Sequence, residues 1–380
     1  MRMAPHLLYV GDVPVEASYH GSALVYRLLS DYPAESLMIF ETGAESKPER
    51  RLKHVKYISH PIGKPRWLNT RFHPYAVAWF SQAGTRLGPK IAQSLNGFTS
   101  EGVLTVAHGF GWLAAADVAN RKGVPLHLIV HDDWPRVAAI APALRSWLDA
   151  RFGSVYRQAR SRLCVSPAMS RVYHERYGER AEVIYPSRAG DCAEFAEPPA
   201  RLGRNDRPFT IAFAGTINSD GYVEALRALQ ASLKTVSGRL LVFGPQQINL
   251  DADIRGLVPA DELLIRLREE ADALFVPMSF DPADRANMEL AFPSKLADYT
   301  ATGLPLLIYG PRYCSAVAWA RENEGVAEIV ETPTDLSSAI GRLANDPAHR
   351  LTLGQRALVT GRKYFSYYQV QKAFIRALSA

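Results

Sequence analysis

Short apolar runs alternate with longer amphipathic stretches along almost the whole chain. The runs predict ten strands, over residues 6–11, 36–42, 103–107, 126–131, 161–166, 182–186, 209–215, 239–244, 273–277 and 305–309. Between them, apolar residues recur every three or four positions, as at Leu226, Leu229 and Leu233, which is the spacing of one helix face. Strands that are apolar throughout are typical of parallel sheets covered on both faces. The alternation therefore predicts an α/β protein with doubly wound, Rossmann-like sheets.

The length of the chain and one shift in composition divide this pattern in two. For 380 residues, two domains are the natural expectation. Residues 190–208 hold adjacent prolines and many charges without periodicity, so we predict a linker there, after which the strand-to-glycine pattern restarts. The prediction is an N-terminal domain over 1–189, a C-terminal domain over 209–360 and a terminal amphipathic helix over 361–380.

Charge and cysteine content exclude several classes of protein. The chain has 44 Lys and Arg against 38 Asp and Glu, which gives a mild net charge of +6. The basic residues are scattered along the chain. A nucleic-acid binder is therefore disfavoured, whereas weak attraction to an anionic membrane stays open. Cys164, Cys192 and Cys314 lie far apart, which argues against a disulfide scaffold or a zinc–cysteine site. Because the apolar run Leu7–Val10 is too short for a signal peptide or a spanning helix, we expect a cytoplasmic protein, at most peripheral at the inner membrane face.

The loops that follow the strands are where chemistry is expected, since open parallel sheets bind ligands beyond the carboxyl ends of their strands. None of them carries G-x-G-x-x-G or a P-loop, which disfavours a dinucleotide oxidoreductase and a P-loop ATPase. After Pro293, Ser294 is predicted to cap a helix whose N–H groups, beside the Lys295 ammonium, would cradle a diphosphate. Asp298, one turn further, would accept hydrogen bonds from a ribose. An ordinary capped helix with charges in its first turn explains the same residues.

The stretch FPSKLADYTATGLPLLIYGP (292–311) resembles the donor-binding segment of GT-B-fold glycosyltransferases, particularly the retaining family 4 group. There a P-[ST]-K-[LIV]-x-[ED]-Y-x-x-x-G-x-P run is a variant of the second half of an E-x7-E motif. Segments similar to that group follow in the same order at 19–29, 122–135, 159–178, 209–229 and 271–279. The resemblance implies two Rossmann-like domains facing a central cleft. It also implies that the C-terminal domain holds most of the nucleotide sugar and that a final helix returns to the N-terminal domain.

The resemblance also assigns roles to single residues. The family's histidine that contacts the donor sugar matches His131, although an imidazole that only bonds the following turn fits the sequence as well; His108 is a weaker candidate. Glu289, one residue from the expected first glutamate, would orient the sugar hydroxyls or is a surface charge. Gly11 and Asp132 are expected to line the cleft.

The sequence departs from the family pattern at the start of the second domain. The family has an arginine and a lysine there, which neutralise the leaving diphosphate, whereas Gly215 is followed here by Thr216 and, at the lysine position, by Asp220. Each lost charge-assisted contact could forfeit about 2–4 kcal/mol of transition-state stabilisation. Lys295 with its helix start, together with Arg285, could compensate, and Gly215 and Thr216 are still expected at the diphosphate. A non-catalytic member of the fold stays an alternative.

Two candidate metal sites are weak. One can be drawn from His127 and His131 with the adjacent acids Asp132 and Asp133, but loop surroundings of this kind fit a metal site poorly. The other is the D-x-D at Asp251–Asp253, a pattern that a chain of this composition contains about once by chance. We therefore expect no metal and no cofactor.

These observations predict a metal-independent glycosyltransferase that moves a sugar from a nucleoside-diphosphate sugar, a UDP- or GDP-sugar, to an acceptor hydroxyl, with retention implied by the resemblance. The acceptor would be a glycan, a lipid-linked compound or a small molecule in polysaccharide or glycoconjugate biosynthesis. The basic and aromatic stretch 60–75 suits such an acceptor or an ordinary exposed loop. The alternatives are a non-catalytic GT-B-like nucleotide-binding, glycan-binding or scaffold protein and a nucleotide-sugar epimerase.

Overall fold

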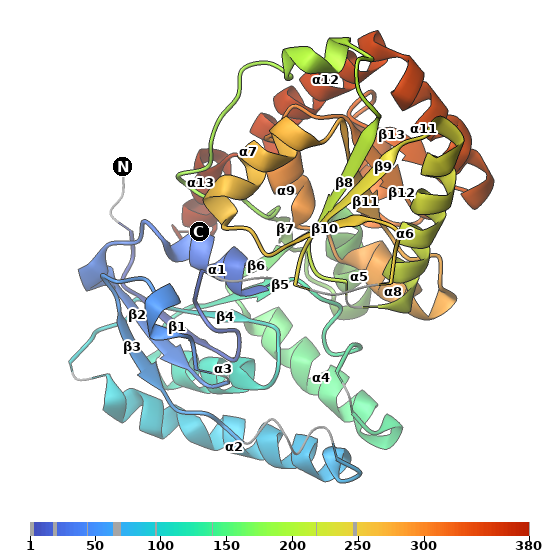
Figure 1. Cartoon of the computed structure of the whole chain (residues 1–380). Helices are drawn as coiled ribbons and strands as arrows, with labels where there is room; N and C mark the ends of the chain where they lie inside the picture. Colours follow the sequence, from blue (N-terminus) through green and yellow to red (C-terminus); the bar gives the residue numbers. More distant parts are fainter. Residues whose placement is uncertain are drawn as a thin grey trace. The chain divides into compact units, whose positions relative to one another are not determined.

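The computed structural model describes residues 4–17, 21–43, 45–63, 70–95, 97–138, 140–217, 219–245 and 249–379. The chain divides into two compact units, one of Met1–Tyr185 with Val370–Ala380 and the other of Pro186–Gln369 (Figure 1). Each unit is a parallel sheet covered by helices. No helix in the described ranges is both long enough and apolar enough to cross a membrane.

The first unit has a seven-stranded parallel sheet in the order β3-β2-β1-β4-β5-β6-β7. Its strands are β1 Leu7–Gly11, β2 Leu37–Glu41, β3 Lys56–Ser59, β4 Gly102–Val106, β5 Leu126–Val130, β6 Ser161–Cys164 and β7 Glu182–Val183. Its helices are α1 Gly21–Leu29, α2 His73–Ser94, α3 Gly111–Lys122, α4 Pro142–Gln158, α5 Pro167–Tyr177 and, from Val370 onward, α13 Tyr367–Ser379. The strand order reverses between β1 and β4, which is where a doubly wound sheet opens a ligand crevice.

Helix α13 brings the end of the chain into the first unit. Phe374 and Leu378 are buried, and Gln371 Nε2 donates to the carbonyls of Arg27 (2.7 Å) and Leu28 (3.1 Å) at the end of α1. The stretch 361–380 is therefore two helices, the end of α12 and then α13. Of the two, only α13 belongs to this unit, from Val370 onward.

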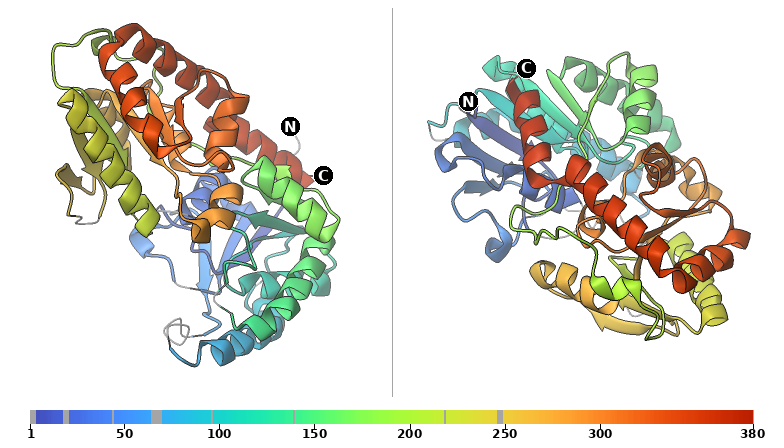
Figure 2. Two further views of the ribbon diagram at one scale, coloured as in Figure 1. Left: turned by 90° about the vertical axis from the view of Figure 1, so that its right-hand side faces the viewer. Right: turned by 90° about the horizontal axis from the view of Figure 1, so that it is seen from above.

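The second unit has a six-stranded parallel sheet in the order β10-β9-β8-β11-β12-β13. Its strands are β8 Thr210–Ala214, β9 Arg239–Phe243, β10 Asp253–Gly256, β11 Ala273–Pro277, β12 Leu306–Tyr309 and β13 Glu328–Val330. Its helices are α6 Asp220–Leu233, α7 Ala260–Glu270, α8 Arg285–Leu290, α9 Lys295–Tyr299, α10 Ser315–Glu322, α11 Leu336–Asn345 and α12 Pro347–Phe365. In the two views of Figure 2, helices lie on both sides of each sheet.

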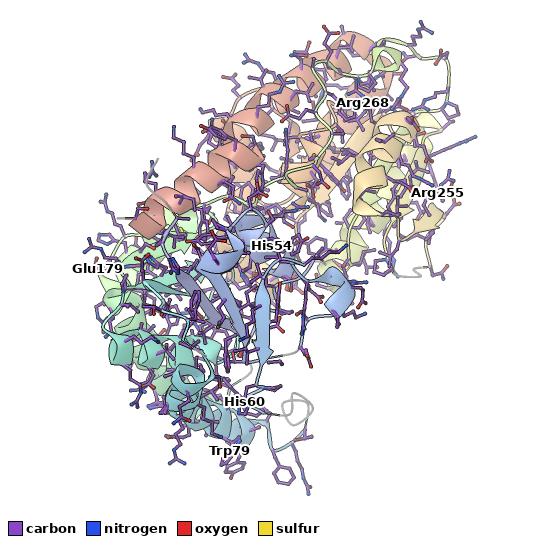
Figure 3. All side chains as sticks on the ribbon, turned by 90° about the vertical axis from the view of Figure 1, so that its left-hand side faces the viewer. His54, His60, Trp79, Glu179, Arg255 and Arg268 are labelled. Carbon is purple, nitrogen blue, oxygen red and sulfur yellow. The ribbon has the colours of Figure 1, made fainter. Side chains whose placement is uncertain are left out.

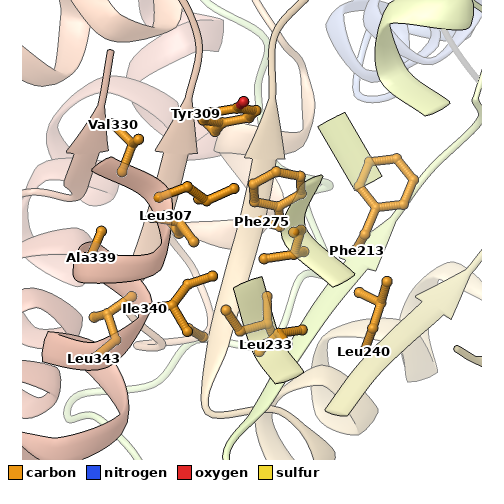
Figure 4. Packing of buried hydrophobic residues seen from close by; sticks show 14 of the residues in the cluster. Phe213, Leu233, Leu240, Phe275, Leu307, Tyr309, Val330, Ala339, Ile340 and Leu343 are labelled. Atoms are coloured by element: carbon orange, nitrogen blue, oxygen red, sulfur yellow. The ribbon is translucent and has the colours of Figure 1, made fainter. Parts of the chain in front are cut away.

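The core of the second unit lies between its sheet and helices α6 and α11. Phe213 and Phe275 from the strands pack with Leu233 of α6 and with Ile340 and Leu343 of α11, all of them buried (Figure 4). The predicted helical spacing of Leu226, Leu229 and Leu233 is confirmed by α6, where all three are buried. This packing fixes the end of β8 and the start of α6, the two elements that frame the site described below.

All ten predicted strands form, and β3, β10 and β13 are three that the apolar runs did not predict. Each of the three lies at the edge of its sheet. An edge strand has one unpaired side and is less buried, as the exposed and half-buried residues of β3 and β10 show, so it needs no continuous apolar run.

The segment 190–208 falls within the second unit. It contains a short 3-10 helix, Ala200–Gly203, and Arg201 pairs there with Asp272. Arg350 of α12 donates to the backbone of Leu202 and Arg204. The segment is thus held to its own unit by buried polar contacts.

Candidate functional site

In the second unit, Lys295 places its amine beside the end of β8. Its Nζ lies 4.2 Å from the ring centroid of Phe213 and 5.5 Å from that of Tyr222, the latter in the first turn of α6. A Cβ built on Gly215, whose φ is +141°, would lie 3.6 Å from the same nitrogen. Residues from β8, α6 and α9 therefore meet around one ammonium. We call Phe213, Gly215, Tyr222 and Lys295 the lysine cluster.

Within the described ranges, the Lys295 amine has no counter-ion. Among the residues the structure describes, none forms a hydrogen bond or salt bridge with it, and its polar contacts are the two aromatic faces. Burial lowers the pKa of Lys295 from 10.5 to about 7, because the ammonium loses hydration without gaining a carboxylate. The residue as a whole is half-buried, so the lysine cluster is not sealed from solvent. An anionic ligand would supply the partner that the protein omits.

The N-terminus of α6 adjoins the lysine cluster. Ser219 holds the N-cap position with extended backbone, yet its side chain makes no capping bond. Its Oγ is buried and has no hydrogen-bond partner among the described residues. The first N–H groups of a fourteen-residue helix point in the direction that favours an anion. The sequence analysis missed Ser219 and Tyr222, and the only available signal was a serine directly before a helical pattern.

Three other predicted residues lie near these elements. Thr216 is half-buried directly after Gly215, and Asp220 is exposed in the first turn of α6. Ser294 precedes α9, but its backbone is helical and its side chain makes no capping bond. The prediction that Ser294 caps the N-terminus of this helix is wrong. A capping serine has non-helical backbone and accepts a hydrogen bond from the first turn, whereas the backbone of Ser294 is helical and its side chain accepts no such bond.

Asp298 on α9 is half-buried and close to a buried cation of its own unit. Arg188 donates to the Ala297 carbonyl (3.1 Å) and to Thr300 Oγ1 (3.2 Å). Burial lowers the pKa of Arg188, and Cys192 and then Asp298 act in the opposite direction. The carboxylate predicted for the ribose therefore also stabilises a structural arginine.

Glu289 lies on α8. In the described chain no hydrogen bond or ion pair joins it to Lys295. Its charge adds to burial in raising the pKa of Cys314 to about 12, and Arg285 on the same helix stacks on Tyr313 at 4.7 Å. Both charged residues thus lie against the start of α10.

In the first unit, the loop after β1 is closed by its own carboxylate. Asp12 accepts hydrogen bonds from the N–H groups of Phe110 and Gly111 (3.0 Å) and from Thr42 Oγ1 (2.5 Å). Burial raises the pKa of Asp12, and these three donors oppose the shift. A Cβ on Gly109 or Gly111 would collide with this carboxylate. The N-terminus of α3 therefore already holds an anion.

Gly11 has a structural explanation that needs no ligand. A Cβ there would lie 2.6 Å from the Tyr9 hydroxyl, which donates to the Val13 carbonyl at 2.6 Å. Any larger residue would displace a buried tyrosine. The glycine is therefore required by packing inside the unit.

His108, His131 and Asp132 gather at the ends of β4 and β5, and we call them the histidine cluster. His131 Nε2 lies 3.1 Å from Asp132 Oδ2, and the two imidazole centroids are 5.9 Å apart. His131 Nδ1 is buried without a hydrogen-bond partner in the described chain. A side chain larger than hydrogen at position 21 would collide with the His131 ring, because a Cβ built on Gly21 would lie 2.7 Å from His131 Cε1. Burial, followed by His131, lowers the pKa of His108. One ligand atom from each member lies within 4.8 Å of the others, so the cluster could hold a cation or a substrate hydroxyl.

His127 and Asp133, the other two residues of the metal site suggested by the sequence, have partners of their own. His127 Nδ1 lies 2.8 Å from Ser161 Oγ inside the sheet, and burial lowers the pKa of His127 to about 4. Asp133 is fully buried and pairs with Arg176. The four-residue set is therefore excluded, because a side chain inside the sheet and one in an ion pair cannot turn to the histidine cluster.

Comparison with known proteins supports the fold. No family model matches the chain, and no curated protein matches its sequence. The solved structure of Anabaena HepE in complex with UDP and glucose matches 99% of this chain and 100% of its own, with a TM-score of 0.68 and 11% identity. Sucrose-phosphate synthase from Thermosynechococcus elongatus matches 97% of each chain (TM-score 0.66, 13% identity). A UDP-forming α,α-trehalose-phosphate synthase from Burkholderia xenovorans, in complex with glucose-6-phosphate, matches 99% of this chain and 100% of its own (TM-score 0.63, 15% identity). The two Rossmann-like units of this chain thus have the GT-B fold of glycosyltransferases.

Proposed function

We propose that the chain is a glycosyltransferase that transfers a sugar from a nucleoside-diphosphate donor to an acceptor hydroxyl. The observation that carries the proposal is Lys295, which lies at the end of β8 and beside the first turn of α6 and has no counter-ion among the described residues. UDP is the first nucleotide to test, because HepE has been solved with UDP and the trehalose-phosphate synthase is UDP-forming.

The two units favour different sides of such a reaction. In the first unit, Asp12 directly follows β1 and accepts hydrogen bonds from the N-terminus of α3, where its carboxylate would repel a diphosphate. In the second unit, the equivalent position after β8 carries Gly215, with the Lys295 amine nearby and the Ser219 hydroxyl unpartnered among the described residues. We therefore assign the donor phosphates to the second unit.

The chemistry asked of the lysine cluster is charge stabilisation. When the bond between the sugar and the diphosphate breaks, negative charge builds on the departing oxygen. A fixed ammonium and helix N–H groups in a partly dry site stabilise that charge more than water does. Lys295 would thus replace the arginine and lysine whose positions hold Thr216 and Asp220.

The remaining roles stay predictions. Asp298 is assigned to the ribose, Glu289 and His131 to the sugar, and Thr216 and Ser294 to the edge of the diphosphate. Gly11 and Asp132 are assigned to the sugar side of the first unit. Retention of configuration and the family 4 grouping rest on the sequence resemblance. A glycan, lipid-linked or small-molecule acceptor is compatible with this assignment.

A thermal-shift panel with UDP, GDP, ADP and dTDP tests the donor site. A nucleotide at 100 times its dissociation constant adds about 2.7 kcal/mol to the free energy of unfolding. We expect UDP to raise the melting temperature of the wild type and not of Lys295→Met, whereas Lys234→Met, an exposed lysine in the same unit, keeps the shift. If UDP raised the melting temperatures of Lys295→Met and Lys234→Met equally, Lys295 would not be part of the nucleotide site.

Two alternatives are separated by their products. A nucleotide-sugar epimerase would convert its UDP-sugar into an isomer of the same mass without any acceptor. Chromatographic separation of the sugar isomers, in a reaction without acceptor, therefore distinguishes an epimerase from a transferase. A non-catalytic binding protein, favoured by Thr216 and Asp220, would show the thermal shift with no turnover on any donor.

The proposed transfer is expected to survive chelation. Lys295 supplies the positive charge that a divalent cation would bring to the diphosphate, so EDTA-treated protein should transfer sugar at the untreated rate. A rate that falls with EDTA and returns with Mg²⁺ or Mn²⁺ would contradict this, and loss of the metal response in His108→Ala would trace it to the histidine cluster.

A further inference from the structure

The net positive charge of this chain comes from one segment. Residues 51–100 contain eight Lys and Arg and no Asp or Glu, while the other 330 residues hold 36 basic and 38 acidic residues. The basic residues are spread along the chain, as expected, but the acidic residues are not, because this segment contains none of the 38 Asp and Glu. The whole of α2, His73–Ser94, lies in this segment and carries no carboxylate.

Helix α2 has one packed face and one unpartnered face among the described residues. Ala76, Val77 and Phe80 are buried on the side that packs against α3. On the opposite side, Tyr75 is 77% exposed and Trp79 is 57% exposed. Figure 3 labels Trp79. Gln82, Arg86 and Lys90 continue the same exposed stripe at helical spacing, and Phe72 precedes it. We call Phe72, Tyr75, Trp79, Arg86 and Lys90 the α2 face.

The α2 face is unusual for a surface that meets only water. Nine large hydrophobic residues are well exposed among the described ones, and three of them, Phe72, Tyr75 and Trp79, fall within eight positions. Tyrosine and tryptophan combine an apolar ring with a polar group, and such side chains gather at the headgroup level of a bilayer. Arg71, stacked on Phe72 at 4.9 Å, adds a further cation at the same end.

We propose that the α2 face docks on the surface of an anionic lipid bilayer. The rings of Phe72, Tyr75 and Trp79 enter the headgroup region, and Arg86 and Lys90 lie against lipid phosphates. Charge complementarity selects this occupant. A second copy of the same face would bring like charges together, and a sugar chain would meet no carboxylate on α2 to accept bonds from its hydroxyls.

Vesicle co-sedimentation of the full chain tests this docking. We expect the protein to pellet with vesicles of equal phosphatidylcholine and phosphatidylglycerol, and not with phosphatidylcholine alone. Tyr75→Ser combined with Trp79→Ser should weaken binding about tenfold or more, and Arg86→Glu with Lys90→Glu should abolish it. Tyr368→Ser, which alters a tyrosine that is 70% exposed elsewhere, and Lys234→Glu serve as matched controls that should bind like the wild type.

Three results would overturn the proposal. These are failure to pellet with anionic vesicles, equal binding to neutral vesicles, and full binding by both double variants. A dimer in sedimentation velocity that the aromatic double variant dissolves would reassign the α2 face to self-association. Because the UDP thermal shift does not involve α2, it should be the same in all these variants, so failure here and failure of the proposed function are distinguishable.

Discussion

Replacing Lys295 with methionine is expected to lower kcat/KM for sugar transfer by about 10²–10³-fold and to raise the melting temperature of the ligand-free protein at pH 6. The rate falls because the leaving diphosphate loses its fixed cation. The stability rises because methionine fills a similar volume among Phe213 and Tyr222 without a charge to desolvate. Initial rates with saturating acceptor and thermal unfolding measure the two effects.

The pH dependence of the stability difference is an internal check. The pKa of Lys295 is about 7 in the folded protein and 10.5 when unfolded. Between these values the unfolded chain binds the extra proton, so this lysine makes the wild type more stable as pH rises. The advantage of Lys295→Met should therefore be largest below pH 7 and shrink toward pH 10. An unchanged transfer rate, or a variant that is less stable at pH 6, would contradict the assignment.

Replacing Arg350 with alanine is expected to reduce the free energy of unfolding by about 3–5 kcal/mol. Arg350 is 2% exposed, and its guanidinium donates to the carbonyls of Leu202, Arg204, Leu343 and Ala344 and to the Asn205 side chain. Alanine would leave these buried oxygens without donors and would open a cavity at the end of α11. The midpoint of urea unfolding, followed by circular dichroism, measures the loss.

Arg342→Ala is the matched control for this prediction. Arg342 lies on α11 with a side chain that is 56% exposed, and it pairs with Glu328. Removing such a surface pair typically costs under about 1 kcal/mol. Equal losses for the two variants would mean that Arg350 acts as a surface charge and does not anchor segment 190–208.

The central strands and the order of the elements could be predicted from the sequence because burial on both faces enforces apolar runs. Val242 and Phe275 lie in such runs, whereas β3 and β13 at the sheet edges are shorter and mix apolar with polar residues. Segment 190–208 looked like a linker because its contacts are polar. Arg350 reaches it from about 150 positions away, and no local pattern reports such a pair.

The candidate site was predictable only in part for a similar reason. Lys295 stood out within a local motif, but the contact of its amine with Phe213 joins residues about 80 positions apart. The unpartnered Ser219 hydroxyl depends on the packing of α6. Asp12 carried no motif at all, and its engagement by the start of α3 appears only when β1 and β4 lie side by side.

Because no described residue forms an ion pair with Lys295, nucleotide binding at the proposed site is expected to be coupled to proton uptake. At pH 8 the free amine, with a pKa of about 7, is mostly neutral, and a bound diphosphate would raise that pKa and draw a proton from solution. The heat of binding measured by calorimetry would then change with the ionisation enthalpy of the buffer. Affinity for the nucleotide would fall as the solution becomes more alkaline than pH 7, and each product release would return the proton.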